Sequence, residues 1–165
     1  MKHIILFLLA VGVVVTLTYI IVHNKATAPE QTEEVVETPI ETPSIPNDIA
    51  AHIASKSDLI VLTSPDPYDT ISSPVALTGK ARGYWFFEAS FPVTVVNWDG
   101  LIIGEGIATA DGEWMTEEFV PFTASIEFTV DPAVYSKNGS LILMRDNPSG
   151  LPENDNALEI PVIFE

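Results

Sequence analysis

The sequence predicts an all-β fold, a sandwich of about seven strands that follows a membrane anchor and an acidic stalk. Residues 4–22 are uncharged and mostly leucine or β-branched, and an acidic, proline-rich stretch comes after them. Beyond it, short runs rich in Val, Ile, Leu, Phe and Thr alternate with turn residues, which is typical of a β-sandwich. The chain therefore divides into an anchor at 1–25, a stalk at 26–57 and a β-domain at 58–165.

The apolar run from Ile4 to Val22 predicts a single transmembrane helix. A helix rises ~1.5 Å per residue, so this run nearly matches a hydrocarbon core about 30 Å thick. A cleaved secretory signal is the alternative, but its apolar region usually runs about 7 to 15 residues. The nearby small-x-small cleavage site at 26–28 is directly followed by Pro29, which disfavours cleavage by signal peptidase there. We therefore expect an uncleaved signal-anchor in the cell membrane, with the C-terminal domain outside the cytoplasm.

The stalk combines repeated glutamates with prolines, so it offers little apolar area to offset chain entropy. We expect residues 26–46 to form an extended, disordered spacer. Near the end of the stalk, Asp48 is placed to cap a short helix that has Ile49 and Ile53 on one face. We interpret this helix as a tether that leans on the β-domain, in preference to any role for His52.

Seven segments of the β-domain predict strands. They are residues 59–63, 74–78, 93–98, 101–107, 125–130, 140–144 and 158–164. Strand side chains point alternately to opposite faces, and in the fifth segment Ile126, Phe128 and Val130 oppose polar neighbours. Pro161 lacks an N–H, which predicts that the last strand lies at an edge or turns this position outward. Asp99-Gly100 between two apolar runs predicts a hairpin, and Asp111-Gly112 before Trp114 is a second turn candidate.

The charge of the chain excludes one class of partner. Its 165 residues include 23 acidic and 7 basic side chains, for a formal net charge of -16 at pH 7. Such a field repels phosphate backbones, whose binding needs clustered Lys and Arg. We therefore expect no nucleic-acid partner. The chain has no cysteine, so it forms no disulfide and no thiolate metal site.

A series of short motifs in the β-domain resembles a known family. The motifs are Leu59-Ile60-Val61, Ser64-Pro65, Ser73-Pro74-Val75, Gly79-Lys80-Ala81-Arg82-Gly83, Phe87-Glu88-Ala89, Asp99-Gly100, Gly112-Glu113-Trp114, Phe119 and Glu159-Ile160-Pro161-Val162. Their order and spacing resemble the immunoglobulin-like domain of bacterial spore germination. The resemblance implies an immunoglobulin-like sandwich in a bacterial envelope protein, with adhesion or assembly roles and no known catalytic residues. It leaves the anchor and the stalk uncovered.

Four consecutive aromatic residues, Tyr84, Trp85, Phe86 and Phe87, form a candidate interaction surface together with Trp114. On a strand, Tyr84 and Phe86 cannot share a face with the other two. We expect one pair in the core and the second covered by loops of the domain or by a partner. Contiguous exposed aromatic area is typical of interaction surfaces.

Clusters of acidic and amide residues make calcium worth considering, because this ion prefers several such oxygens at one locus. The clusters lie at 146–147 and 153–156, and at Asp66 and Asp69. No spacing among them reproduces a known ligand loop. We therefore expect a solvated acidic face, with no metal site and no cofactor.

The composition of the β-domain argues against an enzyme. No histidine follows His52, so a serine nucleophile lacks its usual adjacent base. Lys80 and Lys137 are the unusual bases left for a serine nucleophile. A pair of carboxylates is the other route to catalysis, but no spacing marks one. The candidates are Glu88, Glu105, Glu113, Glu117 and Glu118. We expect no catalytic residues.

These observations predict a non-catalytic, membrane-anchored module outside the cytoplasm, which binds an envelope protein or takes part in envelope assembly. A sheet face or a strand edge is the expected means of recognition. The alternative is a carbohydrate or cell-wall binding domain in which Trp85, Tyr84 or Trp114 stacks on sugar rings.

Overall fold

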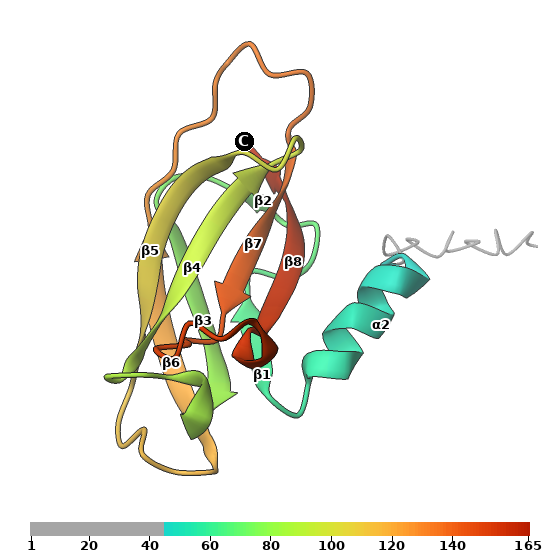
Figure 1. Ribbon diagram of the computed structural model, residues 1–165. Coiled ribbons are helices and arrows are strands. Elements are labelled where there is room, and N and C mark those ends of the chain that lie inside the picture. The colour runs from blue at the N-terminus through green and yellow to red at the C-terminus, as the bar shows by residue number, and fades with distance from the viewer. Residues whose placement is uncertain (1–44) are drawn as a thin grey trace, which may run out of the picture. The chain divides into compact units, whose positions relative to one another are not determined.

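The computed structural model describes residues 45–165 (Figure 1). The predicted anchor at 4–22 and the stalk up to residue 44 lie outside the described residues. Between residues 45 and 165, no helix is long and apolar enough to cross a membrane. The elements are α2 (Asn47–Lys56), β1 (Ile60–Ser64), β2 (Thr70–Ile71), β3 (Val75–Arg82), η1 (Gly83–Trp85), β4 (Ser90–Asn97), β5 (Ile102–Ala110), β6 (Phe119–Ile126), β7 (Asn138–Met144), η2 (Pro152–Asn154) and β8 (Ala157–Phe164).

The strands form one curled sheet of eight strands in the order β1-β3-β6-β5-β4-β7-β8-β2. All neighbours are antiparallel except β2 and β8, which are parallel. β5 and β6 share just two residue pairs, Thr109 with Thr123 and Ala110 with Phe122. Because this junction is so narrow, β1, β3 and β6 fold over the other strands. The predicted all-β fold is confirmed, with β2 as a two-residue strand that the sequence pattern did not reveal.

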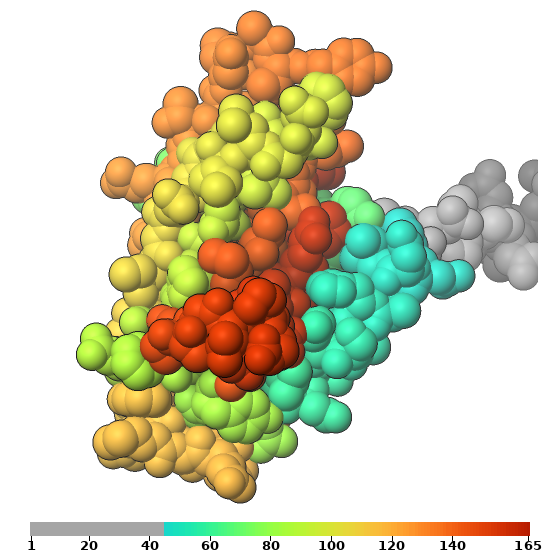
Figure 2. All heavy atoms as spheres, viewed as in Figure 1, coloured from blue at the N-terminus to red at the C-terminus, as the bar shows by residue number. Residues whose placement is uncertain are grey.

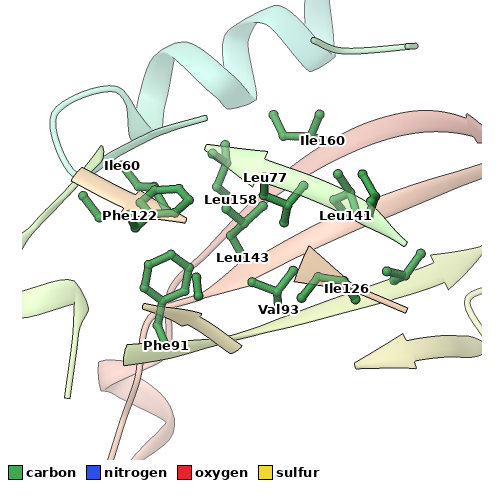
Figure 3. Packing of buried hydrophobic residues seen from close by; sticks show 14 of the residues in the cluster. Ile60, Leu77, Phe91, Val93, Phe122, Ile126, Leu141, Leu143, Leu158 and Ile160 are labelled. Carbon is green, nitrogen blue, oxygen red and sulfur yellow. The ribbon is translucent and has the colours of Figure 1, made fainter. Parts of the chain in front are cut away.

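The core lies between the two halves of the curled sheet (Figure 3). Leu77 from β3 and Phe122 and Ile126 from β6 meet side chains from β4, β7 and β8, and all of them are buried. The rings of Phe91 and Phe122 meet edge to face across this core, with centroids 5.0 Å apart. Aromatic pairs in this geometry add stability beyond the area that they bury.

β6 differs from the strand predicted at 125–130. It begins at Phe119 and ends at Ile126, so just two predicted residues belong to it. The expected alternation of burial does continue past the strand end, with Glu127 exposed and Phe128 buried. After Ile126 the backbone leaves the ladder, because the Phe128 N–H donates to Oγ of Ser73 at 2.9 Å. The alternation of buried and exposed side chains that predicted this strand therefore continues beyond the last residue of β6.

Both predicted turns with an Asp-Gly sequence are present. Gly100 has φ of 75° and its N–H donates to the carbonyl of Asn97 at 2.9 Å, which closes the β4–β5 hairpin. The Asn97 side chain accepts two further backbone N–H groups in the same turn, from Asp99 and Leu101. Gly112 also has a positive φ, which glycine adopts without steric strain.

The predicted helix is present as α2, and it packs against β8. It begins at Asn47 with Pro46 as its N-cap residue, so the prediction that Asp48 caps the helix is wrong. Ile53 packs on the core, and Nζ of Lys56 donates to Oδ1 of Asn156 at 2.6 Å. These contacts tie the helix to the β-domain.

Pro161 occupies a position of β8 that needs no N–H toward β7. Its carbonyl accepts the Tyr68 N–H at 2.7 Å, and two residues later the Ile163 N–H donates to the carbonyl of Asp69. The backbone N–H and C=O groups at odd-numbered positions of β8 thus point away from β7. Pro161, which has no N–H, therefore faces outward as predicted.

Candidate binding surface

The aromatic run at 84–87 lies in a tight turn and not in a strand. Residues Gly83–Trp85 form η1, which breaks the expected alternation. Trp85 is 0% exposed and Phe86 is also buried, whereas Tyr84 is 46% exposed and Phe87 is 42% exposed. The two exposed rings are therefore separated in sequence by two core rings. They do not form a continuous aromatic row.

Contacts from the far end of β7 hold this turn in place. Nε of Arg145 donates to the Tyr84 carbonyl at 3.2 Å, and the Asp146 N–H donates to the Trp85 carbonyl at 3.0 Å. Phe86 packs on Phe91 with ring centroids 5.3 Å apart. Nε1 of Trp85 is buried without a hydrogen-bond partner among the described residues. Trp85 and Phe86 therefore belong to the core, and Tyr84 and Phe87 remain available for contacts.

Trp114, the fifth candidate, is half-buried and packs against the core from the loop before β6. Residues 114–116 form a tight bend in which the Thr116 N–H donates to the Trp114 carbonyl at 2.8 Å. The Met115 side chain is exposed beside it. Trp114 thus acts mainly as a cover over one end of the core.

A surface that the sequence did not single out lies on the side of β5, β4, β7 and β8 that faces away from the core. We call it the outer face and define it by three transverse rows of residues, in which strand pairing joins all neighbours except Pro92 and Met144, which line one hollow. The rows are Ile107, Pro92, Met144 and Ala157; Glu105, Thr94, Ile142 and Glu159; and Ile102, Val96, Ser140 and Pro161. Figures 1 and 2 view the domain from this side, with η2 raised over the lower end of the face.

The outer face is mostly apolar although it lies outside the core. Ile107 is 62% exposed and Ile102 is also exposed, while Ile142 and Val96 are half-buried. Thr94 in the centre is buried between its neighbours. The charged members of the face are Glu105 and Glu159, which lie at the two ends of one row. The half-buried Ile142 and the buried Thr94 thus lie between two exposed carboxylates, with the exposed Ile107 and Ile102 in the adjoining rows.

A hollow of about 380 Å³ continues the outer face at its lower end. Pro92, Met144 and Ala157 line it together with Arg145 and Asp155. The loop beside it is held by its own hydrogen bonds, since Nδ2 of Asn147 donates to Oδ1 of Asp155 at 2.7 Å. The hollow is therefore lined by apolar side chains of the strands and by polar groups next to a loop that its own hydrogen bonds hold in place.

Exposed aromatic rings mark the opposite end of the same half of the sheet. Trp98 at the end of β4 lies beside Tyr135, with ring centroids 5.7 Å apart and planes inclined by 59°. They are 49% and 91% exposed. A second hollow of about 200 Å³ lies between the β4–β5 hairpin and the loop before β7. It is lined by Leu101, Ile103, Val130 and Val134 among others.

The sequence carried a signal for the outer face that the strand assignment alone did not use. Residues 92–96 read Pro-Val-Thr-Val-Val, a run with no charged residue, and β5 begins with two isoleucines. Strands that are apolar on both faces are typical of sheets covered on both sides. Here η2 and its loop lie over one end of the second side (Figure 2), α2 flanks it at β8, and Ile107 and Ile102 are exposed on it.

The acidic clusters that suggested calcium are dispersed or engaged within the loops. Asp69 accepts the Asp66 N–H at 2.8 Å through its carboxylate, and Asn147 bonds Asp155 as described above. Among residues 45–165, no three His, Cys, Asp or Glu side chains lie close enough together to hold a metal ion.

Comparison with known proteins assigns the domain to a family. A family model described as the immunoglobulin-like domain of bacterial spore germination matches residues 59–150. The match covers more than half of the 165 residues, and it runs from just before β1 to the loop after β7. No curated protein and no solved structure matches the chain. The chain therefore belongs to the immunoglobulin-like domain family of bacterial spore germination.

Proposed function

We propose that this protein is a membrane-anchored binding or envelope-assembly module whose immunoglobulin-like sandwich works outside the cytoplasm without catalysis. Recognition takes place on the outer face of β5, β4, β7 and β8. The observation that carries the proposal is the exposure of apolar side chains there, above all Ile107 at 62%.

Physical arguments support a contact role for this face. Contiguous apolar surface that is open to water is typical of protein interaction sites. The strands beneath it are fixed by the core, so the face is a rigid platform that needs little ordering upon binding. The family membership supports a domain of the adhesion or assembly type, and residues 4–22 supply the proposed anchor.

Carbohydrate or cell-wall binding is the second candidate function. The exposed Trp98 and Tyr135 rings favour it, because aromatic faces stack on sugar rings. Trp85, named first for this role from the sequence, is fully buried. The stacking role would therefore fall to Trp98 and Tyr135, with Tyr84 as a separate exposed ring.

Photo-crosslinking in native cells tests the proposal. The photoreactive residue p-benzoylphenylalanine would replace Ile107 in one full-length variant and Thr78, an exposed residue of β3 on the other half of the sheet, in a matched control. We expect a discrete protein adduct at position 107 and none at position 78. Equal labelling at both positions would refute recognition by the outer face. An adduct that shifts in mass upon muramidase digestion would favour the cell-wall alternative.

A further inference from the structure

We infer that the partner of the outer face is a protein segment that carries an apolar side chain between two Lys or Arg side chains about 14 Å apart. This inference rests on the proposed function, since it names the chemistry of the partner at the same surface. It is carried by the central row of the outer face, in which Glu105, Thr94, Ile142 and Glu159 are paired in register.

The spacing of the two carboxylates follows from the sheet. Neighbouring strands lie about 4.8 Å apart, so three steps place the Cα atoms of Glu105 and Glu159 roughly 14 Å from each other. Both side chains are exposed, and neither forms an ion pair within residues 45–165. Thr94 and Ile142 between them add no charge. The row therefore offers two carboxylates without an ion pair in the described part of the chain, at a fixed separation, with the uncharged side chains of Thr94 and Ile142 between them.

Charge complementarity selects a cationic partner. The outer face contains no Lys or Arg, and the chain as a whole carries a net charge of -16. Two cations lie near its lower end, where Arg145 lines the hollow and donates to the Tyr84 carbonyl, and Lys56 donates to Asn156 of the same lining. A second copy of the chain would bring the same acidic row against this one, and like charges repel at such range. An anionic glycan would meet the same repulsion.

An extended peptide segment matches the row geometrically. Residues in a strand rise about 3.4 Å each, and side chains at positions i, i+2 and i+4 point to one side. Positions i and i+4 are thus about 14 Å apart, which equals the separation of the carboxylates. A sequence of the form Lys-x-apolar-x-Lys would place its cations over Glu105 and Glu159 and its central side chain between Thr94 and Ile142.

The test uses the full-length chain in detergent micelles with p-benzoylphenylalanine in place of Ile107, which lies in the row next to Glu105. Three biotinylated peptides are the probes: Lys-Thr-Leu-Thr-Lys, the same peptide with Glu for both Lys, and the scrambled Lys-Thr-Lys-Thr-Leu. Below saturation, adduct yield follows affinity. We expect the first peptide to give the highest yield, and its yield to fall as salt concentration rises, because salt screens exposed charges.

Charge-matched variants isolate the two carboxylates. The double variant Glu105→Gln and Glu159→Gln should lower the yield with the first peptide by about threefold to tenfold, as expected for the loss of two exposed ion pairs. The control Glu117→Gln and Glu127→Gln changes the net charge equally at exposed positions outside the outer face, and should change the yield by less than about twofold. Equal losses in both double variants, or equal yields from all three peptides, would overturn the inference.

The native-cell experiment separates this inference from the proposed function. If position 107 captures a protein in cells but the peptides show no charge or spacing preference, the outer face binds a partner of another chemistry and the inference alone fails. If position 107 captures a second copy of this chain, the inference of a cationic partner is likewise overturned. If it captures nothing in cells and none of the peptides, both proposals fail.

Discussion

The backbone N–H of Glu159 donates a hydrogen bond to Nε2 of His52, 3.0 Å away, although 107 residues separate the two along the chain. The bond joins α2 to the side of β8 that faces away from β7. Farther along this side, Tyr68 and Asp69 complete the backbone hydrogen bonds of Pro161 and Ile163. The outward groups of β8 are thus paired in turn by a side chain and by the segment that leads into β2. A paired edge is protected from adding a foreign strand.

His52→Ala removes the acceptor for the Glu159 N–H. Because the pair lies at the surface, water replaces part of the lost bond, and we expect the free energy of unfolding to fall by about 0.5 to 1 kcal/mol. Hydrogen exchange, read at the Glu159 amide, should become faster, whereas exchange at the Ile160 amide, which faces β7, should stay slow. Unchanged exchange at Glu159 would contradict a stabilising role for His52.

Trp85→Ser and Tyr84→Ser separate core from surface within the aromatic run. Trp85 is fully buried, so its truncation should lower the free energy of unfolding by about 3 to 5 kcal/mol. Tyr84→Ser should cost far less, because its ring is nearly half exposed. Urea denaturation of both variants measures the difference. Similar losses of stability in the two variants would mean that the turn at η1 does not place Trp85 in the core and Tyr84 at the surface.

Gly79→Ala tests the close approach of β3 to its neighbours. A Cβ at this position would lie 2.4 Å from the Val61 carbonyl oxygen and 2.5 Å from the Phe122 ring. Since both neighbours are fixed in the sheet or the core, we expect a loss of about 1 to 3 kcal/mol in the free energy of unfolding. Thr78→Ala, an exposed change one residue away, serves as the control in the same denaturation series and should stay within about 0.5 kcal/mol.

Ile107→Thr introduces a hydroxyl group on the outer face, and Val93→Thr introduces one in the core on the opposite side of the same strands. Ile107 is on the open outer face, so its replacement should alter the free energy of unfolding by no more than about 0.5 kcal/mol. Val93 is 1% exposed in the core, where a buried hydroxyl without a partner costs about 1 to 3 kcal/mol. Thermal and urea unfolding of the two variants provide the measurement. If Ile107→Thr were the more damaging change, the outer face would not be free.

Local pattern predicted most of the strands because each one depends on neighbours close in sequence. The apolar runs around Asp99-Gly100 became β4 and β5, and Leu158, Ile160, Val162 and Phe164 all point into the core. The helix at α2 was likewise visible from the spacing of Ile49 and Ile53. The end of β6 was not, because alternation of buried side chains continues to Phe128 after backbone pairing has stopped.

The candidate site depended on packing that no local pattern encodes. Four aromatic residues in a row were consistent with a strand, yet hydrogen bonds from Arg145 and Asp146, some sixty residues away, hold them in a turn that buries Trp85 and Phe86. Trp98 gained Tyr135 as a neighbour only because the loop before β7 returns to the β4–β5 hairpin.

The sequence by itself determined the all-β character of the domain, most of its strands, its two Asp-Gly turns and its family, because alternation and turn chemistry act over a few residues. Only the tertiary structure decided which apolar side chains lie inside. Ile107 and Val93 are equally apolar in the sequence, but the curl of the sheet buries one and leaves the other exposed. The same curl aligned Glu105 with Glu159 in one row, since register across four strands is set by long-range pairing.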